Sequence, residues 1–513
     1  MRSLTMACAM GSCLFSAGQT FNVRHDLLSS INNSGAAWSV ETTSDGNFAV
    51  FSNGNYSDSV FFSSVVRCLV LSSSGELTSE VIVPDFVHAT YPGWSNGSHQ
   101  RSDGGFVVGG SNFRTDSLDN WIQRPVLFFF DGNGIYEQQI PLGPDNEEWI
   151  GRQAKQTSDG GYVICGETTV DGTHTDAFVI KTDPEGNEQW TQTYGGPWND
   201  YFVAVDQWSN SRYYSSGIRR ISPSNMEFWV VALNDTGGIV WEKIWGGFFP
   251  ESNANVSVAQ NGDVLVAGKW GYNGFAIGRR YLARLDPEDG SFIWQREYGP
   301  QASDIALQMV KEIAPSMDLI SAGPMSLGSA GYRGTLLRTT SAGDSLWMRS
   351  YHYEDTLVEL GGGFFRDVTP TSDGGFIAVG TAMPVSGIYS QDVWVVKVDE
   401  HGCLEPGCHI ITGMETQITN MRDVLHVWPN PVQLSSPINV ELRLPEHFIA
   451  EGQLRITLTS SDGRLVHEAQ ISKKDISRTH SLTLSLSHPF PGLYHLHLSD
   501  ATRWISGAKL VVE

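Results

Sequence analysis

The chain has 513 residues, with 54 glycines, 16 tryptophans and only 17% charged side chains. This composition is typical of a β-rich fold with many tight turns and argues against a helical bundle or a disordered chain. The 33 basic and 56 acidic residues give a net charge of −23, which argues against nucleic acid as a partner, because phosphate binding needs a basic surface.

Residues 1–18 have the layout of a secretory signal peptide, with Arg2 before an apolar stretch that ends at Phe15 and small residues after it. The alternative is a lipoprotein with lipid on Cys13, although Met10 replaces the Leu that is usual in such motifs. No other segment approaches the ~18 consecutive apolar residues of a membrane span, so we predict no transmembrane segment.

The strongest pattern in the chain is an internal repeat of about 55 residues. Ser-Asp-Gly-Gly occurs three times, a Ser-Asp-Gly-Asn variant occurs once, and degenerate copies fill the intervals. The glycines of this motif tolerate positive φ and predict a tight turn between two strands. Seven copies result, at residues 44–47, 102–105, 158–161, 208–211, 260–263, 316–319 and 372–375.

The third copy predicts the anatomy of one unit. Short apolar runs alternate with turn motifs, which indicates strands joined by hairpins. Each copy is therefore expected to be a four-stranded antiparallel sheet. In the third copy the strands are expected at 153–157, 162–166, 177–181 and 188–194, with tight turns at 158–161 and 183–187 and a looser connection at 168–176.

One such sheet cannot bury both of its faces, so we predict an all-β fold in which seven sheets form a seven-bladed β-propeller over residues 19–408. Recurring Trp and Phe residues are expected between the blades. The seventh copy lacks a fourth strand, and residues 20–24 are expected to supply it and close the ring. The repeats resemble propeller repeats of secreted bacterial surface proteins over residues 20–400, which implies the fold and no chemistry.

Six cysteines are present, and Cys8 and Cys13 fall within the signal peptide. Cys403 and Cys408 lie in a glycine-containing loop whose spacing lets a disulfide close in an exported protein. Cys68 and Cys165 lie in apolar strand-like runs and are expected to be buried thiols.

A second domain is expected at residues 427–513, after a linker at 409–426. Its alternating apolar and polar residues predict strands with one face in water, as in a small C-terminal β-sandwich. Its distinctive motifs are Trp428-Pro429-Asn430-Pro431, Asp462-Gly463, Pro491-Gly492 followed by Tyr494, and a terminal segment that begins at Lys509.

These motifs resemble the type A C-terminal sorting domain of proteins exported by the bacterial type IX (Por) secretion system. Trp428 stands where that family usually has Tyr, and the exchange keeps an aromatic ring. The resemblance implies that the type IX machinery is a partner. It also implies export through the periplasm to the outer surface or the medium. The alternative is an ordinary β-sandwich adhesion module.

The sequence carries no His-Glu-x-x-His, Gly-x-Ser-x-Gly, phosphate-loop or Cys-x-x-Cys motif. Enzymatic activity is therefore left open, and a non-enzymatic binding module is favoured. Asp-rich turns at 131–134 and 183–187 offer oxygen ligands for calcium, but they lack the spacing of an EF-hand loop. No metal or other cofactor is predicted, with calcium as the alternative.

The short turns fall on one rim of the predicted ring and the long connections on the other, where binding residues are usually carried. A glycan would be held there by stacking and hydrogen bonds, and a basic protein segment by charge. Several residues of these connections also follow Gly-Gly in the crossovers, where the role would be structural. The candidate ligand-binding residues are Trp94, Glu148, Trp149, Trp198, Asp200, Phe249, Glu251 and Asp355.

Three functions are consistent with these patterns. The first is an exported propeller that binds a glycan or a protein through the long-connection rim. The second is a secreted glycan-active hydrolase or lyase that uses carboxylates in the central funnel, for which two carboxyl groups ~5–10 Å apart would be evidence. The third is a structural part of a surface assembly, which a broad exposed apolar patch would indicate.

Overall fold

The computed structural model describes residues 19–25, 35–57, 62–83, 88–115, 121–209, 211–273, 277–303, 305–326, 331–353, 362–383, 391–405, 408, 417–418, 424–434, 436–444, 453–460, 465–471, 479–484, 491–500 and 503–513. The predicted signal peptide, Asp355 of the predicted rim, and Asp462 and Gly463 of the sorting motifs lie outside the described residues. The rest of the account concerns the described residues.

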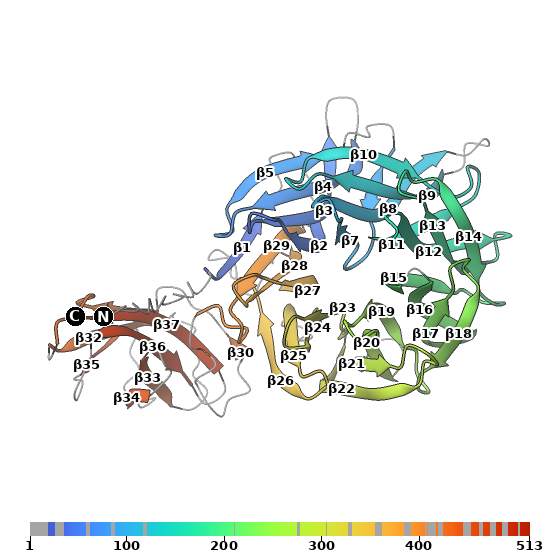
Figure 1. Ribbon diagram of the computed structural model, residues 1–513. Helices are drawn as coiled ribbons and strands as arrows, with labels where there is room; N and C mark the ends of the chain where they lie inside the picture. The colour runs from blue at the N-terminus through green and yellow to red at the C-terminus, as the bar shows by residue number, and fades with distance from the viewer. Residues whose placement is uncertain are drawn as a thin grey trace, which may run out of the picture.

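Antiparallel four-stranded units follow one another along the chain and form the ring in Figure 1, which confirms the predicted propeller. We number these units as blades 1 to 7 in chain order. Blade 1 contains β2 (Ala36–Thr42), β3 (Phe48–Ser57), β4 (Phe62–Leu71) and β5 (Leu77–Ile82). Blade 2 contains β6 (Thr90–Pro92) and β7 (Ser98–Gln100), which share the innermost position, then β8 (Phe106–Thr115), β9 (Trp121–Phe130) and β10 (Tyr136–Pro141).

The next four blades repeat the same order of strands. Blade 3 contains β11 (Trp149–Gln156), β12 (Tyr162–Val170), β13 (His174–Thr182) and β14 (Glu188–Tyr194). Blade 4 contains β15 (Tyr201–Ser209), β16 (Arg212–Ser222), β17 (Asn225–Leu233) and β18 (Ile239–Trp245). Blade 5 contains β19 (Ser252–Val258), β20 (Val264–Asn273), β21 (Ile277–Leu285) and β22 (Phe292–Ser303). Blade 6 contains β23 (Met309–Ile313), β24 (Asp318–Ser326), β25 (Tyr332–Thr339) and β26 (Ser345–Tyr351).

Blade 7 joins the two ends of the propeller segment. Its own strands are β27 (Gly362–Pro370), β28 (Phe376–Met383) and β29 (Asp392–Val398), and its fourth strand is β1 (Phe21–His25). The pairing of β1 with β29 is antiparallel and runs from Phe21 opposite Lys397 to His25 opposite Val393. The prediction that the N-terminal segment completes the last blade is therefore confirmed, and Figure 1 shows β1 beside β29.

Aromatic rings fill the spaces between neighbouring blades, as predicted. The rings of Phe228 in blade 4 and Tyr281 in blade 5 stack with centroids 5.0 Å apart. Tyr351 in blade 6 packs against Phe365 in blade 7 at 5.7 Å, and Phe365 stacks on Trp394 at 4.4 Å. Each buried aromatic removes ~150–250 Å² from water, and a separate apolar cluster holds each pair of neighbouring blades together.

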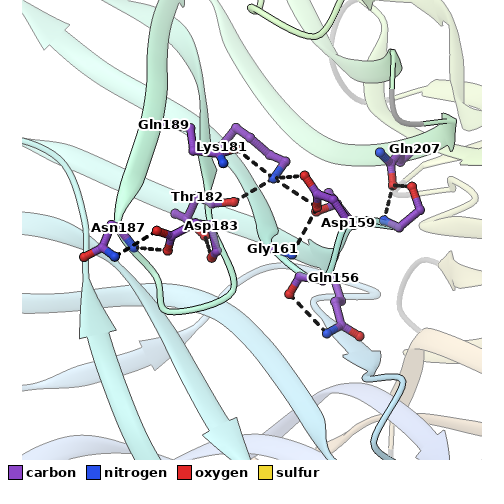
Figure 2. Close-up of polar contacts among 12 residues, drawn as sticks. Gln156, Asp159, Gly161, Lys181, Thr182, Asp183, Asn187, Gln189 and Gln207 are labelled. Carbon is purple, nitrogen blue, oxygen red and sulfur yellow. Dashed lines mark hydrogen bonds and ion pairs between the residues drawn. The ribbon is translucent and has the colours of Figure 1, made fainter.

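The Ser-Asp-Gly-Gly turn of blade 3 is held by its own blade and by Gln207 of blade 4, whose Oε1 accepts the Ser158 N–H at 2.7 Å (Figure 2). The Lys181 ammonium is 1% exposed and lies 2.9 Å from Asp159 Oδ2. Asp159 Oδ1 accepts the backbone N–H of Gly161 at 3.1 Å. Lys397 and Asp373 repeat the ion pair at 2.7 Å in blade 7. The Asp of the motif thus stabilises the turn through a buried cation.

One connection differs from the prediction. The segment expected to be a looser connection, 168–176, belongs mostly to the hairpin of β12 and β13, which pair as far as Val170 opposite His174. Asp171 and Gly172 form the turn with φ of 48° and 66°. An Asp-Gly pair adopts such a turn readily, and its twist matches the strands, so the hairpin extends farther than the apolar run.

The C-terminal unit is a β-sandwich, as predicted, and lies beside the ring in Figure 1. One sheet has the order β31-β32-β35, and β34-β33-β36-β37 face it across a shared apolar core. A two-residue strand, β30, pairs in parallel with both β26 and β37. The strands are β30 (Gln417–Ile418), β31 (Leu425–Trp428), β32 (Ile438–Arg443), β33 (Leu454–Ser460), β34 (Leu465–Ile471), β35 (Thr479–Leu484), β36 (Gly492–Ser499) and β37 (Arg503–Val512).

Candidate functional site

The innermost strands of the blades surround a central channel, and a recurring irregularity directs side chains into it. In five blades the pairing of the innermost strand with its neighbour shifts register near the start of the strand. Such a β-bulge re-aims the extra residue. The shift in blade 5 contains both Asn253 and Ala254. We take one residue from each shift and call the set the bulge ring: Trp38, Arg152, Val203, Asn253 and Arg366.

Blade 2 replaces the bulge with a longer insertion, residues 93–97, which we call the channel segment. A Cβ atom on Gly93 would lie 1.5 Å from the Arg152 carbonyl oxygen, so only glycine fits where the segment leaves β6. Ser95 Oγ donates to Gln308 Oε1 of blade 6 at 3.2 Å. A contact between blades 2 and 6 spans the channel, so the segment divides it into two parts.

Trp94 of the channel segment lies inside the channel and is half-buried. The guanidinium carbon of Arg152 is 3.9 Å from the centroid of its ring, and Tyr201 meets the ring edge-on at 6.3 Å. Trp94 was predicted to line the long-connection rim. The structure places it deeper, because the insertion carries it toward the channel axis.

The part of the channel near the short turns contains a cavity of about 280 Å³, which we call the lower cavity. Residues from all seven blades line it, because equivalent positions of the innermost strands lie at the same level along the channel axis. Two ion pairs cross between blades there: Lys155 with Asp206 at 2.7 Å and Lys311 with Asp367 at 3.2 Å. The other ionisable lining residues are Glu41, His99 and Glu312.

Polar side chains also tie each innermost strand to the next. Gln153 donates to the Asn96 carbonyl at 2.6 Å and accepts the Val205 N–H at 2.7 Å, which links blades 2, 3 and 4. Asp206 accepts the N–H of Val258 at 2.9 Å in blade 5. Buried polar groups that satisfy each other in this way fix the relative positions of the strands.

Two titratable groups of the lower cavity are neutral over different pH ranges. Burial disfavours the charged carboxylate and raises the pKa of Glu41 to about 7. Ser98 Oγ donates to Glu41 Oε1 at 3.3 Å. Burial, with Lys155 as a second cause, lowers the pKa of His99 to about 4. Between about pH 4 and 7 the cavity therefore offers an uncharged acid and an uncharged imidazole beside two ion pairs.

Two predicted rim residues, Asp200 and Glu251, are fully buried, with 0% exposure. The Asp200 carboxylate accepts the backbone N–H of Arg220 at 2.8 Å. Glu251 accepts the N–H groups of Gly247 at 2.9 Å and Gly271 at 2.7 Å, and burial raises its pKa to about 7. Both carboxylates hold a crossover between blades in place, so the structure corrects their expected position on the surface.

Trp149 is also buried, at 6% exposure, because its ring packs on Phe178 with centroids 4.8 Å apart. This position is a correction too, since the side chain belongs to the core between blades 2 and 3. Glu148 is half-buried, and its Oε2 accepts a hydrogen bond from Thr169 Oγ1 at 3.3 Å. These two residues shape the crossover into blade 3.

The remaining predicted rim residues that the structure describes reach the surface of the long-connection rim. Trp198 is 38% exposed. Phe249 is half-buried against Phe248, which is 88% exposed, and their rings meet edge-on at 5.2 Å. The rim therefore presents aromatic rings, whereas its predicted carboxylates at 200 and 251 face inward.

The lower cavity was missed at the sequence level, although a signal for it exists. Glu41, His99 and Lys155 each precede the first residue of their Ser-Asp-Gly turn by three positions. Equivalent positions of innermost strands must face one another across a closed ring. Ionisable residues that recur three positions before the Ser-Asp-Gly turns therefore indicate that the channel is polar at this level.

Two further predicted features concern covalent and metal chemistry. Cys403 and Cys408 form a disulfide, with Cα atoms 5.6 Å apart. The carboxylates of Asp131 and Asp183 accept backbone N–H groups of their own turns. In the described ranges, no group of three or more His, Cys, Asp or Glu side chains is placed to hold a metal ion.

The motifs of the C-terminal domain converge on its last strand. Asn430 Nδ2 donates to the Lys509 carbonyl at 2.8 Å, and Asn430 Oδ1 accepts the Val511 N–H at 2.9 Å. Tyr494 is 5% exposed and lies opposite Leu510 in the core. Trp428, Pro429 and Pro431 flank Asn430, and Pro491 and Gly492 precede Tyr494. The Trp-Pro-Asn-Pro segment thus clamps β37 to the sandwich.

The raised pKa of Glu41 predicts a dependence of stability on pH. Its ordinary value is 4.5, so between about pH 4.5 and 7 the folded protein binds more protons than the unfolded chain. Stability contributed by neutral Glu41 is lost as pH rises through this window. In urea titrations from pH 4.5 to 8, Glu41→Gln should gain up to about 3 kcal/mol on the wild type as pH rises. Glu185→Gln, at an exposed turn, is the control, and parallel pH curves for Glu41→Gln and wild type would contradict the prediction.

Comparisons with solved structures find weak likenesses. A protein of unknown function from Dyadobacter fermentans DSM 18053 is 12% identical over 74% of this chain and 98% of its own, with a TM-score of 0.43. Polysaccharide lyase Uly1 is 10% identical over 71% and 89%, at 0.38. The α-L-arabinanase of Penicillium chrysogenum, complexed with arabinobiose, is 12% identical over 61% and 94%, at 0.40. At these scores the likenesses say nothing about activity.

No curated protein matches the chain. Residues 426–513 match the family described as "Secretion system C-terminal sorting domain". Among the described residues, no helix has the length and apolar character to cross a membrane. The match agrees with the predicted type IX (Por) sorting domain. The chain thus ends in a sorting domain of this family, and the protein is exported by the type IX route to the cell surface or the medium.

Proposed function

We propose that this protein is an exported binding protein whose long-connection rim engages a glycan. The proposal is carried by the distribution of exposed aromatic side chains on the described part of the propeller. Four of them lie on the long-connection rim: Tyr91, Trp121, Trp198 and Phe248, with exposures of 37%, 70%, 38% and 88%. One further exposed aromatic, Trp208, lies on the opposite rim at 40%.

Exposed aromatic rings on one rim of a propeller are candidates for contacts with a ligand. Their rigid side chains supply a large contact area at a low entropic cost. The C–H faces of a pyranose ring stack on such aromatics, and the hydroxyl groups of the sugar form hydrogen bonds with nearby polar side chains. Placement on the surface of an exported protein brings this rim into contact with polysaccharides outside the cell.

The rim proposal predicts a difference between two tryptophans of similar exposure. Trp198→Ala should weaken binding to the best ligand of a glycan array about 5- to 10-fold, because it removes a stacking platform. Trp208→Ala, on the short-turn rim, should leave the affinity unchanged. Isothermal titration of the full mature chain measures both variants. Equal affinities for wild type and Trp198→Ala would contradict the rim as the binding surface.

A glycan-active hydrolase is the second candidate, and the lower cavity favours it. A volume of about 280 Å³ accommodates one sugar residue. Glu41, with a pKa of about 7, has the raised value expected of a general acid, and Asp206 and Glu312 line the same cavity.

Glu41→Gln should abolish release of reducing sugar from any glycan that the wild type cleaves. Activity retained by Glu41→Gln, against Glu185→Gln as the matched control, would exclude Glu41 as the acid.

We expect export through the sorting domain to depend on the attachment of β37. Asn430→Ala removes both hydrogen bonds to this strand and should destabilise the domain by about 1–3 kcal/mol. The secreted fraction, measured by immunoblot of cells and medium, should fall accordingly. Gln433→Ala, an exposed amide three residues away, is the control. Normal secretion of Asn430→Ala would show that the clamp is dispensable.

A further inference from the structure

Arg366 of the bulge ring lies among aromatic rings where blades 6, 7 and 1 meet. Its guanidinium carbon is 3.6 Å from the ring centroid of Trp38 and 4.8 Å from that of Phe364. Tyr332 of blade 6 meets Phe364 edge-on at 6.2 Å. The Trp38 indole donates to Asn53 Oδ1 at 2.8 Å, which fixes the orientation of its ring. Arg366 and the three aromatic side chains around it are half-buried, so each keeps some contact with solvent.

Among the described residues, the Arg366 guanidinium has no counter-charge. Within the described part of the chain, no carboxylate lies at ion-pair distance and no acceptor receives any of its five N–H donors, and Nε is buried without a partner. Burial alone lowers the pKa of Arg366 to about 9. The other cations of the channel differ in this respect.

Arg152 pairs with Glu167, Lys155 with Asp206, and Lys311 with Asp367. Of Arg152, Lys155, Lys311 and Arg366, only Arg366 therefore lacks a carboxylate partner among the described residues. Burying a cation without an anion destabilises the fold through the lost hydration of the charge, and contacts with aromatic rings offset only part of this loss. In a chain with a net charge of −23, a cation that no carboxylate neutralises is available to an external anion.

We infer that Arg366, with the aromatic rings of Trp38 and Phe364, is a subsite for an acidic sugar residue, whose carboxylate or sulfate pairs with the guanidinium. This inference rests on the proposed function and names the ligand class. A planar guanidinium binds an oxyanion through two parallel hydrogen bonds. The adjacent rings present faces on which the sugar ring stacks. An acidic peptide would satisfy the charge but would leave these faces without a matching ring.

The binding test uses the full mature chain and matched polymers. Polygalacturonate should bind at least about tenfold more tightly than its methyl ester, because esterification removes the charge that Arg366 neutralises. A sulfated galactan tests sulfate as the oxyanion. Arg366→Gln should abolish the preference for the acid form. Arg279→Gln, an arginine beside Tyr272 that has a carboxylate partner in Glu297, should keep it.

Stability without ligand gives an independent readout. If Arg366 is kept for an anion, Arg366→Met should raise the urea midpoint of the free protein, because it removes an unpaired charge and keeps the apolar contacts. A lowered midpoint would mean that Arg366 is structural and would overturn the inference.

The outcomes separate this inference from the proposed function. Binding of neutral and acidic glycans alike, unaffected by Arg366→Gln, overturns the acidic subsite and leaves the rim proposal standing. Binding of an acidic peptide but no glycan, in a manner that depends on Arg366, overturns the sugar as the ligand. Failure of every glycan to bind contradicts both.

Discussion

The pairing of β1 with β29 is the contact on which the rest of the structure depends. Blade 7 has three strands of its own, and the described residues between β29 and β31 contribute none to it. The N-terminal segment fills that place, and Asn22 accepts a hydrogen bond from the Trp394 indole at 2.7 Å. Because β1 takes the outermost place in blade 7, its pairing joins the two ends of the propeller segment and closes the ring, and the innermost strands of the blades surround the channel.

The channel in turn gives the two rims different chemistry. Near the short turns, ion pairs between blades line a polar cavity that contains a neutral acid. Near the long connections, Arg152 of the bulge ring packs on Trp94 and Arg366 packs on Trp38, and four exposed aromatics lie on this rim. The channel segment of blade 2 separates these environments. A ligand that enters from one rim therefore meets a different set of groups from one that enters from the other.

Local patterns were sufficient to predict the repeat, the turns, the inter-blade aromatics and the closing strand, because each depends on short sequence signals at regular spacing. The same signals did not predict the position of Trp94, since an insertion inside a strand has no periodicity of its own. Asp200 and Glu251 were expected on the surface because acidic loop residues are usually exposed. Their crossovers contain backbone N–H groups that need acceptors, and that requirement is visible only when the blades are packed together. Arg366 was missed because a bulge, rather than strand alternation, sets its direction.

Ring closure itself is tested most directly by the stability of the whole propeller. Phe21 of β1 is 9% exposed and packs against Phe48 of blade 1 with ring centroids 6.2 Å apart. Phe21→Ala should lower the free energy of unfolding in urea by about 3–5 kcal/mol, whereas Phe248→Ala at the exposed rim should change it by less than about 0.5 kcal/mol. Equal stability of the two variants would mean that the N-terminal strand does not hold the ring closed.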